Sequence, residues 1–322
     1  MTETKVLGHR KQGRLDELLK QAGKDSKVNE VIEKEKRRKL REARKNRQIK
    51  PGNTHFVTNF EPSKEADRII QGIENHIGFD EDTGLVKYSF DSYISGLTPA
   101  NNSLLAIVYF ICGQHRKGKK LLKSIEKNIG FLKLKTGEKL IRLDPKDNIL
   151  DVSENAMLAF AYFTYGHHRK GDKLLEDLEM VMAKNKNILA KPLKDLNQNL
   201  CLPLVYLTAG RDKEEGLGLI KKVEKDYHYE FFDENDQKPK TRLTAKGTAP
   251  NALLALNYFL FRRKQDEAKF LTASIQRFIS FKYFNDGSLL IKDVVNSPRI
   301  NTYDNLLYAL LLMAEQKHLE NE

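Results

Sequence analysis

The chain has 322 residues, 40% of them hydrophobic, so it is long enough to bury one large core or two small ones. Its longest apolar run, Leu104 to Cys112, is far shorter than the roughly 20 residues needed to span a bilayer. The net charge is +12, and residues 1–50 hold 17 Lys and Arg against 8 Asp and Glu, or +9, which leaves 12 − 9 = +3 for the rest. These values argue against a membrane-spanning protein and place the basic character in an N-terminal arm.

This arm, residues 1–55, is expected to lie outside a folded body formed by residues 56–322. Its first thirty residues contain no apolar core of a secretory signal, so the cytoplasm is the expected location. The segment Lys34 to Lys50 has almost no apolar stripe and cannot bury much surface alone. It is either a solvated, partly helical extension or a contact for nucleic acid or an acidic protein surface. The candidate polyanion-binding residues are Lys36, Arg37, Arg38, Lys39, Arg41, Arg44, Lys45 and Arg47.

Beyond the arm the chain contains an internal repeat. Residues Asn102–Leu122 recur as Asn155–Leu175, with 13 of the 21 positions identical. An Asn followed by Leu, Ala and Tyr at +3, +4 and +7 marks most of the units, and residues at these spacings share one helix face. Each unit therefore opens with a helix whose packing face is nearly constant. The units begin at Asn102, Asn155, Asn199, Asn251 and Asn305.

These five helices are apolar on nearly all sides, so we expect them to be inner helices covered by neighbours. Pro203 lies in the third one and predicts a kink or a late start near Leu202. The segments that follow are amphipathic and are expected as outer helices. One more precedes the first inner helix and is expected to pack beside the last one. The outer helices are predicted at 64–76, 119–128, 172–182, 213–225 and 265–279.

Short apolar runs around turn residues predict β-hairpins at 77–88, 129–143, 232–242 and 281–291. The repeat period, about 53, excludes tetratricopeptide and ankyrin units, which are near 34. The predicted fold is all-α: an α/α toroid, or an open arc of one, with about five inner and outer helix pairs and hairpins at one end. Periodicity alone does not distinguish the ring from the arc.

The Asn-Ala-Leu-Leu-Ala inner helix, the Gly-ended turn, the amphipathic outer helix and the Phe-Asp-x-x-Thr-Gly-Leu hairpin together resemble the six-hairpin glycosidase-like α/α toroids. The resemblance covers residues 60–316, with five inner helices visible instead of six. That group includes glycoside hydrolases, sugar epimerases, polysaccharide lyases and proteins without activity, so the resemblance implies a fold and leaves the activity open. It also implies that a substrate would bind at the hairpin end of the ring.

Candidate site residues are those expected at this end. Glycosidic cleavage uses two carboxylates flanking the bond, although a carboxylate beside a helix start also simply favours that start. The candidate catalytic residues are Asp91, Asp151, Glu154, Asp195 and Asp304. The candidate substrate-binding residues are Tyr93, Asn102, Asn155, Asn199, Lys246, Asn251, Arg299, Tyr303 and Asn305. For the five Asn residues a structural role as helix N-caps is the leading interpretation, because five equivalent copies favour a shared structural function.

Nothing in the sequence predicts a metal or a cofactor. No phosphate-binding loop, dinucleotide fingerprint or H-E-x-x-H motif is present, and Cys112 and Cys201 fall in apolar helical segments. The repeated His-Arg-Lys-Gly runs at 115–118 and 168–171 are interpreted as turns between helices, with a basic strip as the alternative.

Two functions stay open, and with them the question whether the protein is an enzyme. One is a non-catalytic toroid whose arm contacts a partner or nucleic acid, and the other is a carbohydrate-active enzyme with a carboxylate pair. A polar cavity holding two carboxylates would favour the enzyme. A ring centre filled by apolar side chains would favour the scaffold.

Overall fold

A computed structural model describes residues 63–90, 97–145, 148–184, 196–210, 213–226, 247–294 and 297–320. The predicted arm lies outside these residues, so its boundary at residue 55 stays a prediction. The inner helices are α4 (Pro99–Ile111), α6 (Val152–Thr164), α8 (Leu196–Thr208), α10 (Thr248–Leu260) and α12 (Thr302–Leu319). The outer helices are α3 (Lys64–Gly72), α5 (His115–Ser124), α7 (His168–Lys184), α9 (Lys213–Asp226) and α11 (Gln265–Phe278).

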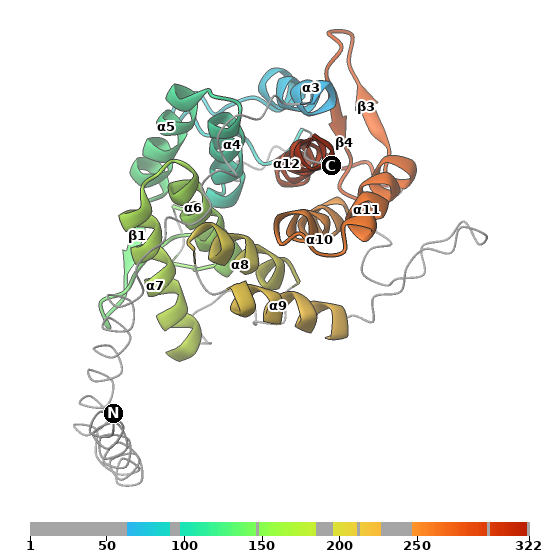
Figure 1. Ribbon diagram of the computed structural model, residues 1–322. Coiled ribbons are helices and arrows are strands. Elements are labelled where there is room, and N and C mark those ends of the chain that lie inside the picture. Colours follow the sequence, from blue (N-terminus) through green and yellow to red (C-terminus); the bar gives the residue numbers. More distant parts are fainter. Residues whose placement is uncertain are drawn as a thin grey trace, which may run out of the picture. The chain divides into compact units, whose positions relative to one another are not determined.

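Within the described part of the chain the inner helices form a closed ring (Figure 1). Each packs against the next in chain order, and α12 packs back against α4. The outer helices α5, α7, α9 and α11 each pack against the inner helix that precedes them, whereas α3 packs against α12. The first helix therefore completes the last pair, as the sequence predicted. The fold is a closed α/α toroid of five pairs, and among its described helices none combines the length and the apolarity needed to cross a membrane.

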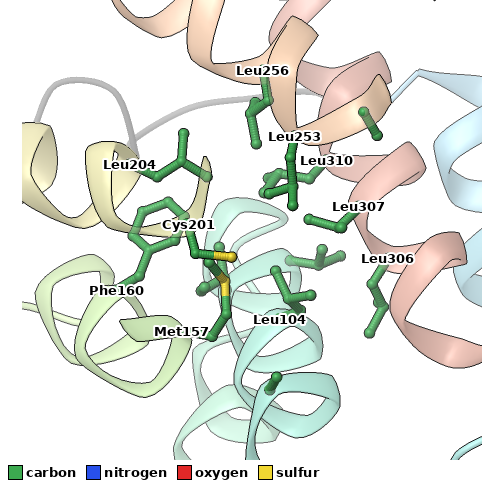
Figure 2. Packing of buried hydrophobic residues seen from close by; sticks show 14 of the residues in the cluster. Leu104, Met157, Phe160, Cys201, Leu204, Leu253, Leu256, Leu306, Leu307 and Leu310 are labelled. Atoms are coloured by element: carbon green, nitrogen blue, oxygen red, sulfur yellow. The ribbon is translucent and has the colours of Figure 1, made fainter. Parts of the chain in front are cut away.

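The centre of the ring is filled by apolar side chains, as Figure 2 shows. They come from all five inner helices, and none of the labelled ones exposes more than 2% of its surface. Burying a side chain of this size contributes roughly 1.5–3 kcal/mol, so this packing dominates the stability of the ring. The labelled residues are Leu104, Met157, Phe160, Cys201, Leu204, Leu253, Leu256, Leu306, Leu307 and Leu310.

Two of the four predicted hairpins are complete. Strands β1 (Phe131–Lys133) and β2 (Lys139–Ile141) pair antiparallel ahead of α6, and β3 (Phe281–Tyr283) pairs with β4 (Leu289–Ile291) ahead of α12. Ahead of α4 the hairpin is reduced to one bridge between Phe79 and Val86. The hairpin predicted at 232–242 lies outside the described residues.

The His-Arg-Lys-Gly runs are not turns, which corrects the sequence interpretation. They form the first turn of α5 and of α7, and the chain reverses just before them at Gly113 and Gly166, whose φ angles are 71° and 83°. Gly118 lies inside α5 because the helix crosses a phenylalanine there. A Cβ at this position would lie 2.5 Å from Cε1 of Phe110. Gly171 meets Phe163 in the same way at 2.8 Å.

The lysine of each run belongs to a Tyr–Glu–Lys cluster that ties an inner helix to the preceding outer helix. Glu126 Oε1 accepts hydrogen bonds from Tyr162 Oη and from Lys170 Nζ, both at 2.7 Å, and the lysine lies 5.4 Å from the centre of the tyrosine ring. Tyrosine holds the +7 position in four units, at Tyr109, Tyr162, Tyr206 and Tyr258, and in three of them, those of Tyr109, Tyr162 and Tyr258, it makes equivalent contacts. The other two clusters are Tyr109 with Glu74 and Lys117, and Tyr258 with Glu224, Arg263 and Lys264.

Helix α8 runs without a break through Pro203 and begins at Leu196, so the expected late start near Leu202 is wrong. Proline has no N–H to donate to the carbonyl four residues back. A neighbouring inner helix supplies a donor close to that gap, because Asn257 Nδ2 donates to the Leu200 carbonyl at 2.9 Å. The carbonyl to which Pro203 cannot donate is that of Asn199, so this hydrogen bond ties α8 to α10 one residue beyond the interruption.

Candidate functional site at the hairpin end of the ring

In three units the repeated Asn docks a hairpin onto an inner helix. Its Oδ1 accepts at 2.8 Å from the backbone N–H of a residue 14 or 16 positions earlier. In the second and fifth units Nδ2 also donates to the carbonyl of that residue, so the amide pairs with the hairpin as a strand would. The pairs are Val86 with Asn102, Ile141 with Asn155 and Ile291 with Asn305.

The predicted N-cap role of the repeated Asn is therefore wrong, although the predicted structural role is correct for these three units. The cap side chains come four residues earlier, and Thr98, Asp151 and Asn301 accept from backbone N–H groups of α4, α6 and α12. The repeated Asn stands at the fourth helical position instead. All five copies are buried, and Asn251 donates to the Gly247 carbonyl. Burial and backbone pairing leave the three docked amides poorly placed to meet a sugar.

Across three units, the position just before the repeated Asn holds two carboxylates and one amide. We call Asn101, Glu154 and Asp304, which occupy this position in α4, α6 and α12, the collar. Glu154 Oε2 accepts from the backbone N–H of Ala100, at the start of α4, and Asp304 Oδ1 accepts from that of Ala249 at 2.6 Å, at the start of α10. Each carboxylate thereby holds the N-terminus of a neighbouring inner helix, where N–H groups lack intrahelical partners.

Asn101, the third member of the collar, was missed from the sequence. It is 1% exposed, and its Nδ2 has no hydrogen-bond acceptor among the described residues. Buried donors are rarely left unpaired, so this amide is a candidate donor to a bound water or ligand. Its repeat position, shared with the two carboxylates, was the signal that could have identified it.

Asp304 is the carboxyl group whose protonation is most clearly perturbed at this end. Burial, reinforced by the nearby charge of Asp293, raises its pKa to about 7 against the opposing hydrogen bonds from the Asn301 side chain and the Ala249 N–H. At neutral pH a substantial fraction of this carboxyl group therefore carries a proton. A carboxyl with such a pKa is suited to donate a proton in a reaction.

Two tyrosines, Tyr88 and Tyr303, lie close enough to both collar carboxylates for the negative charges to raise their pKa values. Burial is the main cause that raises the pKa of Tyr303 well above its usual value, followed by Cys201, whose Sγ lies 3.4 Å from the tyrosine oxygen, and by Glu154 and Asp304. Burial, Asp304 and, more weakly, Glu154 also raise the pKa of Tyr88, which is 40% exposed. Both phenols stay protonated and are available as hydroxyl donors.

The remaining predicted residues are placed less favourably for chemistry. Asp151 caps α6 through bonds from the N–H groups of Ser153 and Glu154, at 2.7 and 3.2 Å. Arg299 has a side chain that is 79% exposed and pairs with Asp293 at 3.4 Å. Asp91, Tyr93, Asp195, Lys246 and the arm residues lie outside the described part of the chain. Of the five candidate carboxylates, the structure therefore brings Glu154 and Asp304 to equivalent positions on the two inner helices that flank α4.

No protein-family model matches this sequence, and a search of curated proteins finds no match. Several solved structures align with most of this chain at low sequence identity. An inactive variant of an alpha-1,6-mannanase of Salegentibacter sp., in complex with alpha-1,6-mannotriose, aligns with 79% of this chain and 99% of its own at 10% identity and a TM-score of 0.47. PssZ from Listeria monocytogenes aligns with 80% of this chain and 98% of its own, at 9% identity and a TM-score of 0.45. A glycoside hydrolase family 76 mannosidase from Bacteroides thetaiotaomicron aligns with 80% of this chain and 98% of its own, at 8% identity and a TM-score of 0.44. Because the identities are 10% or less and the TM-scores are below 0.5, these alignments say nothing about the activity of this chain.

Proposed function

We propose that the hairpin end of this toroid binds a carbohydrate and cleaves or rearranges a glycosidic bond, with Asp304 as the proton donor and Glu154 as its partner carboxylate. The observation that carries the proposal is the raised pKa of Asp304, about 7, at a ring position that α6 fills with a second carboxylate. Glycosidic cleavage by the usual route needs one protonated and one ionised carboxyl group on opposite sides of the bond.

Three further side chains support a ligand at this end. Asn101 Nδ2 offers a buried donor without an acceptor among the described residues, and the Tyr88 and Tyr303 hydroxyls lie in the field of the two carboxylates. Hydroxyl-rich ligands are recognised through such donors and acceptors, and aromatic rings add apolar area for a sugar face. Tyr88 supplies an exposed ring at the site.

The test is a reducing-end assay on a panel of neutral and acidic oligosaccharides with the full chain. Asp304→Asn keeps an oxygen for the Ala249 N–H but has no titratable proton, so we expect kcat to fall by about 10²–10⁴. Wild-type activity should decline above about pH 7 as Asp304 ionises. Asp151→Asn is the matched control, because Asn also caps helices, and its kcat should change less than fivefold. A wild-type protein that neither binds nor cleaves any of the sugars would reject the proposal.

A second function, a non-catalytic scaffold, is favoured by the apolar centre of the ring (Figure 2) and by the use of both collar carboxylates as caps for neighbouring helices. In that case Glu154 and Asp304 only stabilise the ring, and the arm residues between Lys36 and Arg47 provide the contact with a partner. The same variants separate the two functions. The scaffold predicts altered melting temperatures for Glu154→Gln and Asp304→Asn, and no sugar-dependent signal from any form of the protein.

A further inference from the structure

The five outer helices differ sharply in charge. Helix α5 contains five Lys and Arg and no Asp or Glu, which gives 5 − 0 = +5. The other four are balanced: α3 and α11 each hold two basic and two acidic residues, and α7 and α9 each hold four of both, so every one of them sums to zero. Among the outer helices, positive charge is therefore concentrated on α5, which Figure 1 labels on the outer side of α4.

Most of this charge is unpaired within the described part of the chain. Lys117 binds Glu74 in its Tyr–Glu–Lys cluster, but Arg116, Lys119, Lys120 and Lys123 are exposed and make no ion pair with a described residue. The first turn of α5 holds no acidic residue and two cations, although the helix dipole disfavours positive charge at a helix N-terminus. A surface that keeps costly, unpaired charge is not explained by the stability of the fold.

The unpaired cations lie along one side of the helix. Arg116, Lys120 and Lys123 follow one another at spacings of four and three, Lys119 lies beside them, and Lys127 continues the row into the π-helical turn Ile125–Ile129. At a rise of 1.5 Å per residue the row is roughly 16 Å long. Its apolar side, with Leu121 and Leu122, is buried against the ring, so the cations face outward.

The kinds of side chain in and around this row indicate which polyanion it would bind. The large hydrophobic residues that are exposed in the described chain are Tyr88, Ile149, Tyr283 and Leu319, and none belongs to α5. A membrane-surface helix inserts apolar side chains, and single-stranded nucleic acid is held by stacking on aromatic rings, so both lack their usual contacts here. A row of cations that includes no exposed aromatic or large apolar side chain matches a regular phosphate backbone. Duplex DNA is bound without base specificity through contacts to its phosphates alone, whereas binding of duplex RNA also relies on contacts to the 2′-hydroxyls across its minor groove.

We infer that the outward face of α5, formed by Arg116, Lys119, Lys120, Lys123 and Lys127, is a docking surface for the phosphate backbone of double-stranded DNA, bound without base specificity. This surface is separate from the hairpin-end collar and does not depend on a catalytic function there. It is also separate from the predicted polyanion contact of the arm.

The chain provides a matched pair of variants for the test. The triple variant Lys119→Gln, Lys120→Gln, Lys123→Gln removes three charges from α5, and Lys221→Gln, Lys222→Gln, Lys225→Gln removes three exposed charges at the same spacing from the balanced helix α9. Both leave the arm intact and lower the net charge by three. Gln is as good a helix former as Lys, so both should melt like the wild type.

Binding to a duplex DNA of arbitrary sequence is measured at about 50–200 mM salt with the full chain. We expect the α5 variant to lose at least about tenfold in affinity and to lower the salt slope by up to roughly 2.7, or about 0.9 per phosphate contact. The α9 variant should change affinity less than threefold. Equal losses in the two variants, or none, would overturn the inference. So would selective loss of binding to vesicles with anionic lipid while DNA binding is retained.

Discussion

Asp304 makes part of the stability of the protein depend on pH. Its pKa is about 7 in the folded protein and about 3.9 in an unfolded chain, so between these values the folded state holds a proton that the unfolded state has lost. The contribution of this group is fully present below pH 4 and is lost as the pH rises through 7, by on the order of 4 kcal/mol.

We therefore expect Asp304→Asn to flatten the pH dependence of the free energy of unfolding. The variant should be less stable than or equal to the wild type near pH 5 and gain on it by pH 8, as measured by urea unfolding at both values. Burial also raises the pKa of Glu315, to about 6, in the same direction, so the informative quantity is the difference between the two proteins. A constant difference across this range would show that Asp304 ionises normally.

Two helical glycines offer opposite outcomes for the same substitution. Gly118→Ala would place a Cβ 2.5 Å from Phe110, and we expect a loss of about 1–3 kcal/mol despite the better helix propensity of Ala. Gly218 in α9 has open space where a Cβ would stand, so Gly218→Ala should gain up to about 1 kcal/mol. Thermal unfolding of both variants checks the pair, and a stabilising Gly118→Ala would contradict the close packing of α5 on α4.

At the scale of elements, the Tyr–Glu–Lys clusters contribute to the free energy that holds an outer helix against the ring. Burial alone would raise the pKa of Glu126, but hydrogen bonds from Lys170 and Tyr162 lower it overall. Its contribution to stability is therefore present above the unfolded pKa of about 4.3 and is lost as the pH falls through the folded value.

Glu126→Gln should lower the free energy of unfolding at pH 7 by about 1 kcal/mol, a modest value because the cluster is partly exposed. Tyr162→Phe should cost a similar amount, and the double variant less than the sum, since both remove one hydrogen bond. Lys127→Gln, on the same π-helical turn, serves as the control and should stay within about 0.5 kcal/mol. Strict additivity of the two cluster variants would rule out the coupling.

Helix α8 depends on α10 at Pro203. We expect Asn257→Ala to cost about 2 kcal/mol in the wild type, because it removes the donor to the Leu200 carbonyl. In a Pro203→Ala background residue 203 can donate to the Asn199 carbonyl, so α8 relies less on its tie to α10 and the same change should cost less than half as much. Urea unfolding of the four proteins measures the coupling, and equal costs in both backgrounds would show that the amide has no link to the proline.

At the scale of the whole described toroid, every inner helix has an inner neighbour on both sides, so the repeats should unfold together. Ile69 in α3 is fully buried, and Ile69→Ala should cost about 2–5 kcal/mol and shift one common unfolding transition. Hydrogen exchange provides the measurement: amides of α3 and α6 should open with similar free energies. Much earlier opening of α3 would mean that closure through α12 is weak.

The alternation of inner and outer helices was predictable because helices apolar on all sides leave a strong pattern in the sequence. The interpretation of Gly118 failed because glycine in a polar run usually ends a helix, and only the crossing of α5 over Phe110 explains it. The collar was only partly predicted. Glu154 reaches Ala100 across 54 positions and Asp304 reaches Ala249 across 55, contacts between neighbouring helices that no local pattern contains.

Helix α3 packs against α12, the last helix of the described chain, so this contact can form only late in synthesis. Helix α3 emerges from the ribosome about 240 residues before the start of its partner, which at about 5–20 residues per second corresponds to roughly 12–50 s. During that interval Ile69, Ile70 and Ile73 have no α12 to cover them. The nascent chain must carry an amphipathic helix with an uncovered apolar face until translation is nearly complete, and this face is a candidate binding site for a chaperone.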